Sequence, residues 1–174
     1  MVERFISHVF TEGDESSGIL LAWWVELEQN RDERASLRRA RSPQDVAYCP
    51  SFHRLLNQMR GQGYPLGVEG ATALAVVAGV IAHVKAHTAD ASVAENMATP
   101  KMPGGGARVS GLRFRRILVV PDRDELYPHL VRIVRLLGGS VNLVSLANAA
   151  FWWNERTKKE WAYKYYATAP TTEL

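Results

Sequence analysis

Two histidines, His83 and His87, stand four residues apart, which is the spacing that two zinc ligands use on one helix. Metalloproteases with this spacing place a glutamate beside the first histidine, but Val84, Lys85 and Ala86 fill the interval here. Two histidines at the solvent end of a buried helix account for the pattern without a metal. The sequence therefore predicts no metal site.

Residues 104–106 are three consecutive glycines, and with Arg108 they could cradle a phosphate. They lack the lysine and serine that end a nucleotide-binding loop, and they follow no predicted strand, so we interpret them as a linker. The carboxylates of Asp122, Asp124 and Glu125 gather at a predicted helix start, where the helix dipole favours them. No nucleophile, general base or metal cluster assembles, so the sequence predicts no catalytic residue, no cofactor and no enzymatic activity.

The basic residues are mostly arginine, and they occur in blocks. The formal net charge is +3, but residues 1–33 hold eight acids and two bases. Residues 34–60 hold six bases and one acid, residues 101–116 hold five bases and no acid, and residues 156–164 hold four bases and one acid. Blocks that converge in space would suit an anionic polymer, so the charge pattern favours a nucleic acid as partner. A mixed, solvated surface is the alternative.

Helical spacing places several arginines on common faces. The sets at three- or four-residue intervals are Arg34, Arg38 and Arg41; Arg113 and Arg116; and Arg132 and Arg135. Like charges stacked this way repel by a few tenths of a kcal/mol per pair, and an anionic ligand would remove that cost. The alternative is that each arginine pairs with a local acid. That alternative is weakest for residues 113–116, because no acid lies between Glu95 and Asp122.

The elements that must position these residues are all predicted to be helices. The chain has 174 residues, 47% of them hydrophobic, which suits one domain with a sizeable core. Apolar periodicity and capping residues predict an all-α bundle of eight or nine helices, with segment 71–84 buried on all sides and no strand. Prolines and glycines at 99–106 break the chain, so we expect an N-terminal half (1–98), a linker (99–109) and a C-terminal half (110–174), or one compact domain.

The adjacent tryptophans are interpreted as core residues rather than base-stacking platforms. Neighbouring helix positions differ by about 100°, so we expect one member of each pair, Trp23-Trp24 and Trp152-Trp153, in the core and the other at its edge. Residues 1–10 form no signal peptide, and Cys49 has no partner for a disulfide. We therefore expect a soluble, cytoplasmic protein.

Together, several segments resemble the CasB family, the small subunits of the type I-E CRISPR Cascade surveillance complex. In the N-terminal half they are WWVEL (23–27), NR (30–31), RASLRRA (34–40), SP (42–43) and PSFHRL (50–55). In the C-terminal half they are VSGLRFRRIL (109–118), DELY (124–127), WWN (152–154) and WAYKYY (161–166). The resemblance runs in order from about residue 17 to residue 166, and residues 1–16 have no counterpart.

The resemblance implies an all-helical, non-catalytic protein that acts within a larger complex. Two copies would sit side by side, against the backbone subunits that hold the CRISPR RNA and against the large subunit. Their implied role is to hold the displaced non-target DNA strand in a basic groove and so stabilise the R-loop in antiviral defence. The alternatives are a helical adaptor for acidic proteins and a general RNA-binding protein.

The resemblance also implies which residues face nucleic acid. They are the pair Arg38-Arg39, the pair Arg115-Arg116 with neighbouring Arg113, one of Arg132 and Arg135, and the stretch Arg156, Lys158 and Lys159. We expect the stripes around Arg38-Arg39, Arg115-Arg116 and Arg132-Arg135 to line one groove.

Overall fold

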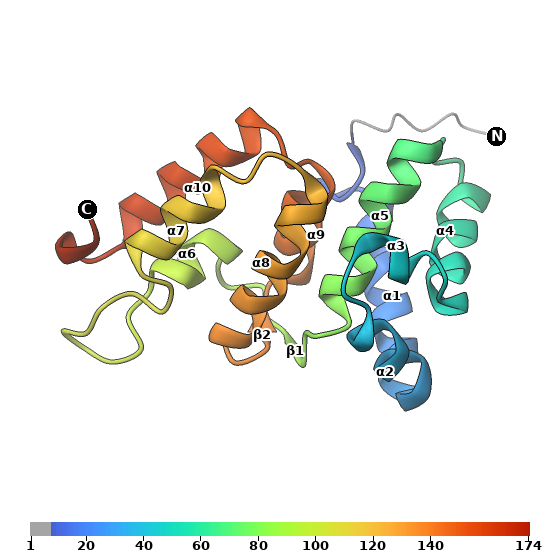
Figure 1. The fold of residues 1–174 in the computed structure, drawn as a ribbon, viewed down its shortest axis with the longest axis horizontal. Coiled ribbons are helices and arrows are strands. Elements are labelled where there is room, and N and C mark those ends of the chain that lie inside the picture. Colours follow the sequence, from blue (N-terminus) through green and yellow to red (C-terminus); the bar gives the residue numbers. More distant parts are fainter. Residues whose placement is uncertain (1–7) are drawn as a thin grey trace.

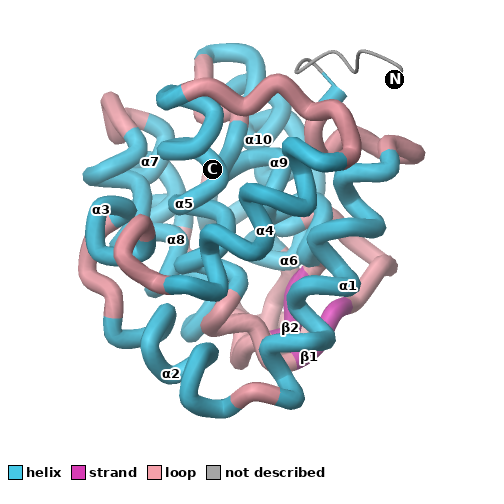
Figure 2. Tube along the Cα trace, turned by 90° about the vertical axis from the view of Figure 1, so that its right-hand side faces the viewer, coloured by secondary structure: helices cyan, strands magenta, loops and turns pink. Residues whose placement is uncertain are grey.

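The computed structural model describes residues 8–174, and this part of the chain is almost entirely helical (Figures 1 and 2). The expectation about the N-terminal segment falls largely on residues 1–7, outside the described residues. The α-helices are α1 (Glu15–Gln29), α2 (Arg31–Arg39), α3 (Pro43–Val46), α4 (Pro50–Gly61), α5 (Val68–Ile81), α6 (Val93–Ala98), α7 (Gly111–Leu118), α8 (Arg123–Leu136), α9 (Leu143–Phe151) and α10 (Glu155–Thr168). A 3₁₀ turn, η2 (Thr171–Glu173), follows. The all-α prediction is confirmed.

Side-chain caps set where most of these helices begin. The side chains of Ser42, Ser110, Asp122 and Asn142 each accept a hydrogen bond from the backbone N–H three residues later. Ser92 forms a complete capping box with Glu95 at the start of α6. These bonds satisfy N–H groups that a helix leaves unpaired at its first turn.

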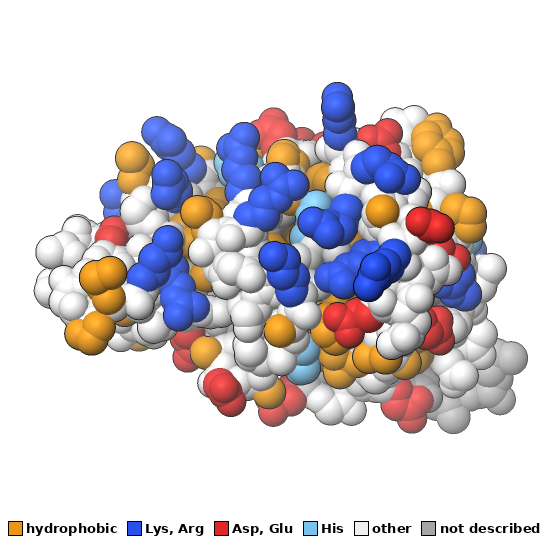
Figure 3. Space-filling view, turned by 90° about the horizontal axis from the view of Figure 1, so that it is seen from below, with side chains coloured by type: hydrophobic (Ala, Val, Ile, Leu, Met, Phe, Trp, Pro, Cys, Tyr) orange, Lys and Arg blue, Asp and Glu red, His pale blue; other side chains and the backbone are white. Residues whose placement is uncertain are grey.

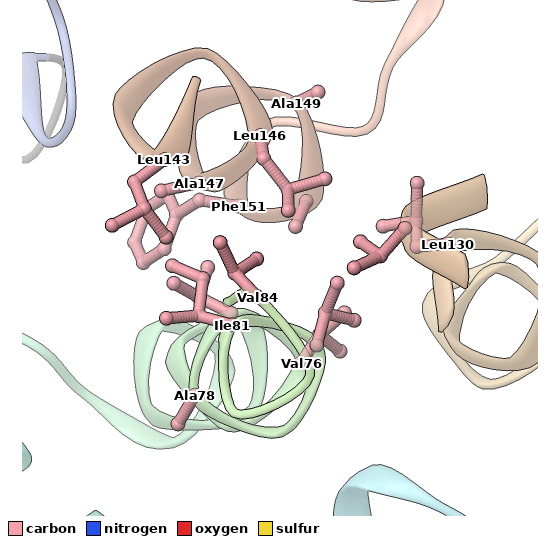
Figure 4. Close-up of a cluster of buried hydrophobic side chains, with 14 of the residues drawn as sticks. Val76, Ala78, Ile81, Val84, Leu130, Leu143, Leu146, Ala147, Ala149 and Phe151 are labelled. Carbon is pink, nitrogen blue, oxygen red and sulfur yellow. The ribbon is translucent and has the colours of Figure 1, made fainter. Parts of the chain in front are cut away.

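Helix α5 is the centre of the molecule, as its apolar sequence predicts. It packs against α3, α4, α8 and α9, and its residues from Ala73 to Ile81 are all buried. Figure 4 shows side chains of α5 facing those of α9, such as Leu146, and Leu130 of α8. A helix that is apolar all round is stable in water only when neighbours cover every face.

The core continues across the predicted linker. Helices α1 to α4 lie toward one end of the molecule and α6, α7 and α10 toward the other, with α5, α8 and α9 between them (Figure 1). Helix α6, which the predicted boundary places in the N-terminal half, packs against α10. Near the N-terminus, the Phe10 ring meets Phe151 edge to face at 5.6 Å, and the Trp152 Nε1–H donates to the Val9 carbonyl at 2.8 Å.

Two expectations about local structure are wrong. A parallel pair of two-residue strands, β1 (Ala86–His87) and β2 (Ser140–Val141), joins the halves, and such short strands leave no periodicity to detect. Because α5 ends at Ile81, His83 and His87 do not share a helix; His87 lies in β1, where its Nδ1 accepts the Leu143 N–H at 3.1 Å. Within residues 8–174 no group of three or more His, Cys, Asp or Glu side chains is placed to hold a metal.

The tryptophan pairs differ from each other. Trp152 is half-buried and Trp153 is buried, as expected, but Trp23 and Trp24 are both buried. The Trp23 Nε1–H donates to the Ser51 carbonyl at 2.9 Å, and the Trp24 Nε1–H donates to the Val84 carbonyl at 3.3 Å. Helix α1 therefore packs between α4 and the segment after α5, so two of its sides face the core. None of the helices in the described part of the chain is long and apolar enough to cross a membrane.

Candidate nucleic-acid interface

A groove between α7 and α8 gathers four of the predicted arginines. Its volume is about 430 Å³. It is lined by Arg113 and Arg116 of α7, by His129, Arg132 and Arg135 of α8, and by the apolar residues Val109, Ile117, Ile133 and Leu136. No carboxylate is among these lining residues. Guanidinium groups over an apolar floor suit a ligand with phosphates and flat, apolar faces.

The buried sides of the two helices turn these arginines outward. Phe114 of α7 stacks on Tyr165 of α10, with ring centroids 3.9 Å apart and planes 6° apart. Arg113 and Arg116 are three residues apart on the exposed side of α7. On α8, Leu130 and Val134 enter the core, and Arg132 and Arg135 are again three apart and exposed. Both members of the Arg132–Arg135 pair line the groove, and which of them contacts nucleic acid stays a prediction.

Arg115 does not line the groove with Arg116. Its Nη1 lies 3.4 Å from the Glu173 carbonyl oxygen, in the C-terminal turn η2. Successive helical residues differ by about 100°, so two adjacent arginines cannot face the same ligand equally. The expected stripe around Arg115-Arg116 is thus corrected: Arg116 and Arg113 belong to the groove, and Arg115 belongs to the contact with η2.

A second basic region lies on α2, and its charge acts on the same histidine as that of the groove residue Arg135. Burial lowers the pKa of His83 to about 4, and the positive charges of Arg135, Arg38 and Arg34 contribute to this shift. Arginines from α2 and α8 therefore act on one imidazole. Figure 3 shows Lys and Arg side chains gathered in a band along one face of the molecule, with Asp and Glu mostly at its borders.

Of the three arginines predicted to share one face of α2 (Arg34, Arg38 and Arg41), only Arg38 is both on the helix and exposed. The Arg34 Nε–H donates to the Ala82 carbonyl at 3.0 Å, and its Nη2 donates to the Val84 carbonyl. Arg34 also lies 3.8 Å from Glu28, so it joins elements of the fold. Helix α2 ends at Arg39, which leaves Arg41 off the helix.

Arg38 and Arg39 are exposed, and neither forms an ion pair within residues 8–174. Local pairing, the alternative considered for these arginines, applies instead to Arg54, which binds Glu33 through two nitrogens. The side-chain hydrogen bond from Arg54 lowers the pKa of Glu33, while burial opposes that shift. Of the four arginines of α2, Arg34 is engaged with the fold, and the two that the resemblance marks, Arg38 and Arg39, are free together with Arg31.

The basic stretch on α10 stands apart from the groove. Lys158 Nζ lies 3.3 Å from a Glu155 oxygen and 5.7 Å from the centre of the Trp153 ring. Arg156 and Lys159 line a separate hollow along α10, which shares no lining residue with the groove. Glu155, Glu160, Tyr163 and Lys164 complete that hollow. Contact of Arg156, Lys158 and Lys159 with nucleic acid stays a prediction.

His129, which lines the groove, was missed from the sequence, and His83 was considered there only as a metal ligand. His129 lies three residues before Arg132, so the stripe 129, 132, 135 could have shown it. Burial lowers the pKa of His129, Arg132 adds to the shift, and Glu125 opposes it. His83 has no such signal, because its arginine neighbours come from α2 and α8.

A profile of the family described as CRISPR-associated protein Cse2 (CRISPR_cse2) matches residues 33–166. The chain belongs to the Cse2 family. All four groove arginines and Arg38-Arg39 lie within the range that the Cse2 profile matches, whereas α1 and η2 lie outside it. No curated protein matches the chain in a search by sequence.

Solved structures share the Cse2 fold. A chain of the crystal structure of E. coli Cascade bound to a PAM-containing dsDNA target matches with a TM-score of 0.67 and 18% identity, over 87% of this chain and 94% of that one. CasB from Thermus thermophilus matches with a TM-score of 0.63 and 22% identity, over 85% and 96%. A separate crystal structure of a Cse2-family protein from Thermus thermophilus matches with a TM-score of 0.63 and 23% identity, over 85% and 96%. The resemblance to the CasB family is confirmed.

Proposed function

We propose that this Cse2 protein is the non-catalytic small subunit of a type I-E Cascade complex and holds the displaced non-target DNA strand during R-loop formation. Membership of the Cse2 family supports this proposal, as does the likeness in fold to a chain of the DNA-bound E. coli complex. Its partners would be a second copy of the chain, the backbone and large subunits, and the CRISPR RNA ribonucleoprotein.

The observation that carries the proposal is the groove between α7 and α8. Arg113, Arg116, Arg132 and Arg135 come from two helices and line one hollow without a carboxylate among them. Exposed arginines that face each other without an acid repel, and the phosphates of a strand would neutralise them. The apolar floor offers a surface for bases without reading their edges.

Sequence-blind binding suits the task. Formation of an R-loop exchanges one duplex for another of similar stability, so modest contacts to the strand backbones can decide its direction. Phosphate contacts contribute affinity but carry no sequence information. A subunit that binds any displaced strand would therefore stabilise R-loops at every target.

The free chain and the complex offer complementary tests. The purified chain should bind single strands weakly and equally for scrambled sequences, whereas a preference of roughly a hundredfold for one sequence would contradict the proposal. The chain should also co-purify with a CRISPR RNA ribonucleoprotein when the other subunits are co-expressed. A chain that binds acidic proteins but neither nucleic acid nor the ribonucleoprotein would be a helical adaptor instead.

A further inference from the structure

The groove between α7 and α8 holds one group whose charge can change near neutral pH. Among the described residues that line it, His129 is the only histidine, and it shares the hollow with Arg113, Arg116, Arg132 and Arg135. Arginines stay charged at any physiological pH, whereas a histidine gains or loses its charge in this range. The groove therefore combines four fixed positive charges with one that responds to its surroundings.

Helix α8 holds the imidazole at the edge of the groove. Leu126 and Leu130 of the same helix are buried in the core, and Arg132 lies one turn after His129 on its side of the helix. The histidine is half-buried, and neither ring nitrogen forms a hydrogen bond within the part of the chain that the structure describes. In that part, the buried side-chain nitrogen or oxygen without a partner is Nε of Arg123, so the nitrogens of His129 are open to the groove rather than sealed in the core.

The charges nearest to His129 disfavour its protonation in the free protein. Burial lowers its pKa, Arg132 lowers it further, and Glu125, one turn earlier on α8, opposes the shift. Helix α7 adds Arg113 and Arg116 to the lining of the same hollow. An imidazole that protonates in this place therefore adds its charge to those of the arginines.

The helices that pack most closely against α8 add little charge around the ring. They are α5, α9 and α3. Helix α9 has no charged residue, α5 has only Glu69 in its first turn, and α3 has only Asp45. The charge of Asp45 acts on Tyr127. The surroundings of His129 are thus positive on balance, and an anion is the ligand that would offset them.

We propose that His129 binds a phosphate of the strand held in the groove and takes up a proton when it does so. The proton comes from the solvent and goes to a free ring nitrogen, and the charged imidazole then donates a hydrogen bond to a phosphate oxygen. The negative phosphate offsets the charge of Arg132, which raises the pKa of His129 in the complex. This contact depends on the proposed function, to which it adds a residue and a proton.

The linked proton makes the affinity for a strand depend on pH. Because the pKa of His129 is higher in the complex than in the free protein, the affinity increases as the pH falls from the bound value to the free value. Above both values the ring is neutral in both states, and below both it is charged in both, so the affinity levels off at either end. The arginines give no such dependence, because they stay charged throughout.

The test measures binding of the full-length chain to oligothymidylate, whose bases and phosphates do not titrate between about pH 5 and about pH 8, at constant ionic strength. Calorimetric titrations in buffers of different ionisation enthalpy count the protons taken up. We expect uptake by the wild type that is largely lost in His129→Gln. That variant should bind about three- to tenfold more weakly at the acidic end and about twofold or less at the alkaline end, as expected for one lost charge-assisted hydrogen bond.

Two further variants separate binding from a structural role of the ring. His53→Gln is the matched control, because His53 is exposed on α4, its Nε2 lies 2.6 Å from the Ala47 carbonyl oxygen, and it does not line the groove. This change should leave the proton uptake in place. His129→Lys supplies a permanent charge, so it should bind at every pH about as tightly as the wild type does in acid, without proton uptake. A ring that only supported the fold would not be replaced by lysine in this way.

The outcomes that overturn the contact differ from those that overturn the proposed function. Absence of proton uptake by the wild type overturns the contact even where His129→Gln fails to fold, and so does uptake that His129→Gln leaves unchanged. Binding that Arg116→Ala weakens at every pH, but that His129→Gln does not alter, removes the contact and keeps the groove. If the wild type binds no strand at any pH, the proposed function fails as well.

Discussion

The ring of Tyr127 lies directly against Gly79. A Cβ added at Gly79 would be 2.5 Å from the Tyr127 hydroxyl oxygen and 2.7 Å from Cγ2 of Val46. Helix α8 therefore packs onto α5 at a residue without a side chain, and the Tyr127 hydroxyl reaches the Ala40 carbonyl at 3.3 Å. Burial raises the pKa of this tyrosine to about 12. The same helix carries Arg132 and Arg135, so this contact sets where half of the groove lies.

Gly79→Ala should destabilise the protein by about 1–3 kcal/mol, because the added methyl group overlaps a ring in a packed core. Gly18→Ala is the control: Gly18 is inside α1 and an added Cβ there meets nothing within 4 Å. That change should stabilise the protein by up to about 1 kcal/mol through helix propensity. Thermal melts of both variants compare the two effects, and equal stabilisation by both would refute the close contact.

Glu173→Ala should loosen the C-terminal turn and cost about 1–2 kcal/mol. The carboxylate of Glu173 accepts the Ala107 N–H at 3.1 Å and the Gly111 N–H at 2.7 Å, which ties η2 to the start of α7. Glu160→Ala removes an equal charge from an exposed pair with Lys164 and should cost about 0.5 kcal/mol or less. Denaturant unfolding compares them, and equal costs would contradict the role of Glu173.

The ion pair between Glu33 and Arg54 should make a small, pH-dependent contribution to stability. Arg54 lowers the pKa of Glu33 in the folded state, so the contribution is present above the unfolded pKa of the carboxyl and is lost as the pH falls through the folded pKa. Both side chains are partly exposed, so Glu33→Gln should cost about 1 kcal/mol or less at neutral pH. Unfolding measured at neutral and at acidic pH should show that the loss of stability caused by Glu33→Gln disappears in acid. A loss of stability that grows in acid would contradict the stabilising role of this ion pair.

Arg115→Ala and Arg116→Ala should separate stability from binding. Arg116 lines the groove, so its loss should flatten the log–log salt dependence of single-strand binding by about 0.7 if it contacts one phosphate. Arg115 contacts η2, so its loss should leave that slope unchanged and shift stability by about 0.5 kcal/mol or less. The measurement is a salt series with one oligonucleotide, beside melts of each variant. Equal slopes for the two variants would mean that the contacts of α7 are misassigned.

Most of the fold could be predicted from local signals in the sequence. Apolar periodicity and capping residues located the helices, and the largely apolar segment 71–84 predicted the central helix. Strands β1 and β2 could not be predicted, since their pairing depends on residues more than fifty positions apart. Both of the first tryptophans are buried because α1 has neighbours on two sides, which is a tertiary property.

The site was predictable as a set of arginines but not as a groove. The i, i+3 spacing showed that Arg113 with Arg116, and Arg132 with Arg135, share faces. Which faces meet depends on how α7 and α8 pack, so Arg115 was grouped with Arg116 from adjacency alone. The place of Arg34 beside His83 likewise depends on a contact between α2 and the end of α5. The stretch on α10 showed the same basic composition, and composition does not report which side of the molecule a helix occupies.

The most direct test of the central claim is target-DNA binding by the reconstituted Cascade complex across a salt series, with Arg113→Ala and Arg116→Ala introduced together. Arg156→Ala with Lys159→Ala removes the same charge from α10 and serves as the comparison. The account predicts that the α7 variant folds, assembles and binds target DNA more weakly for all sequences, with a salt slope flatter by about 1.4 if each arginine contacts one phosphate of a single strand. An assembled α7 variant whose affinity and slope equal those of the wild type would contradict the account.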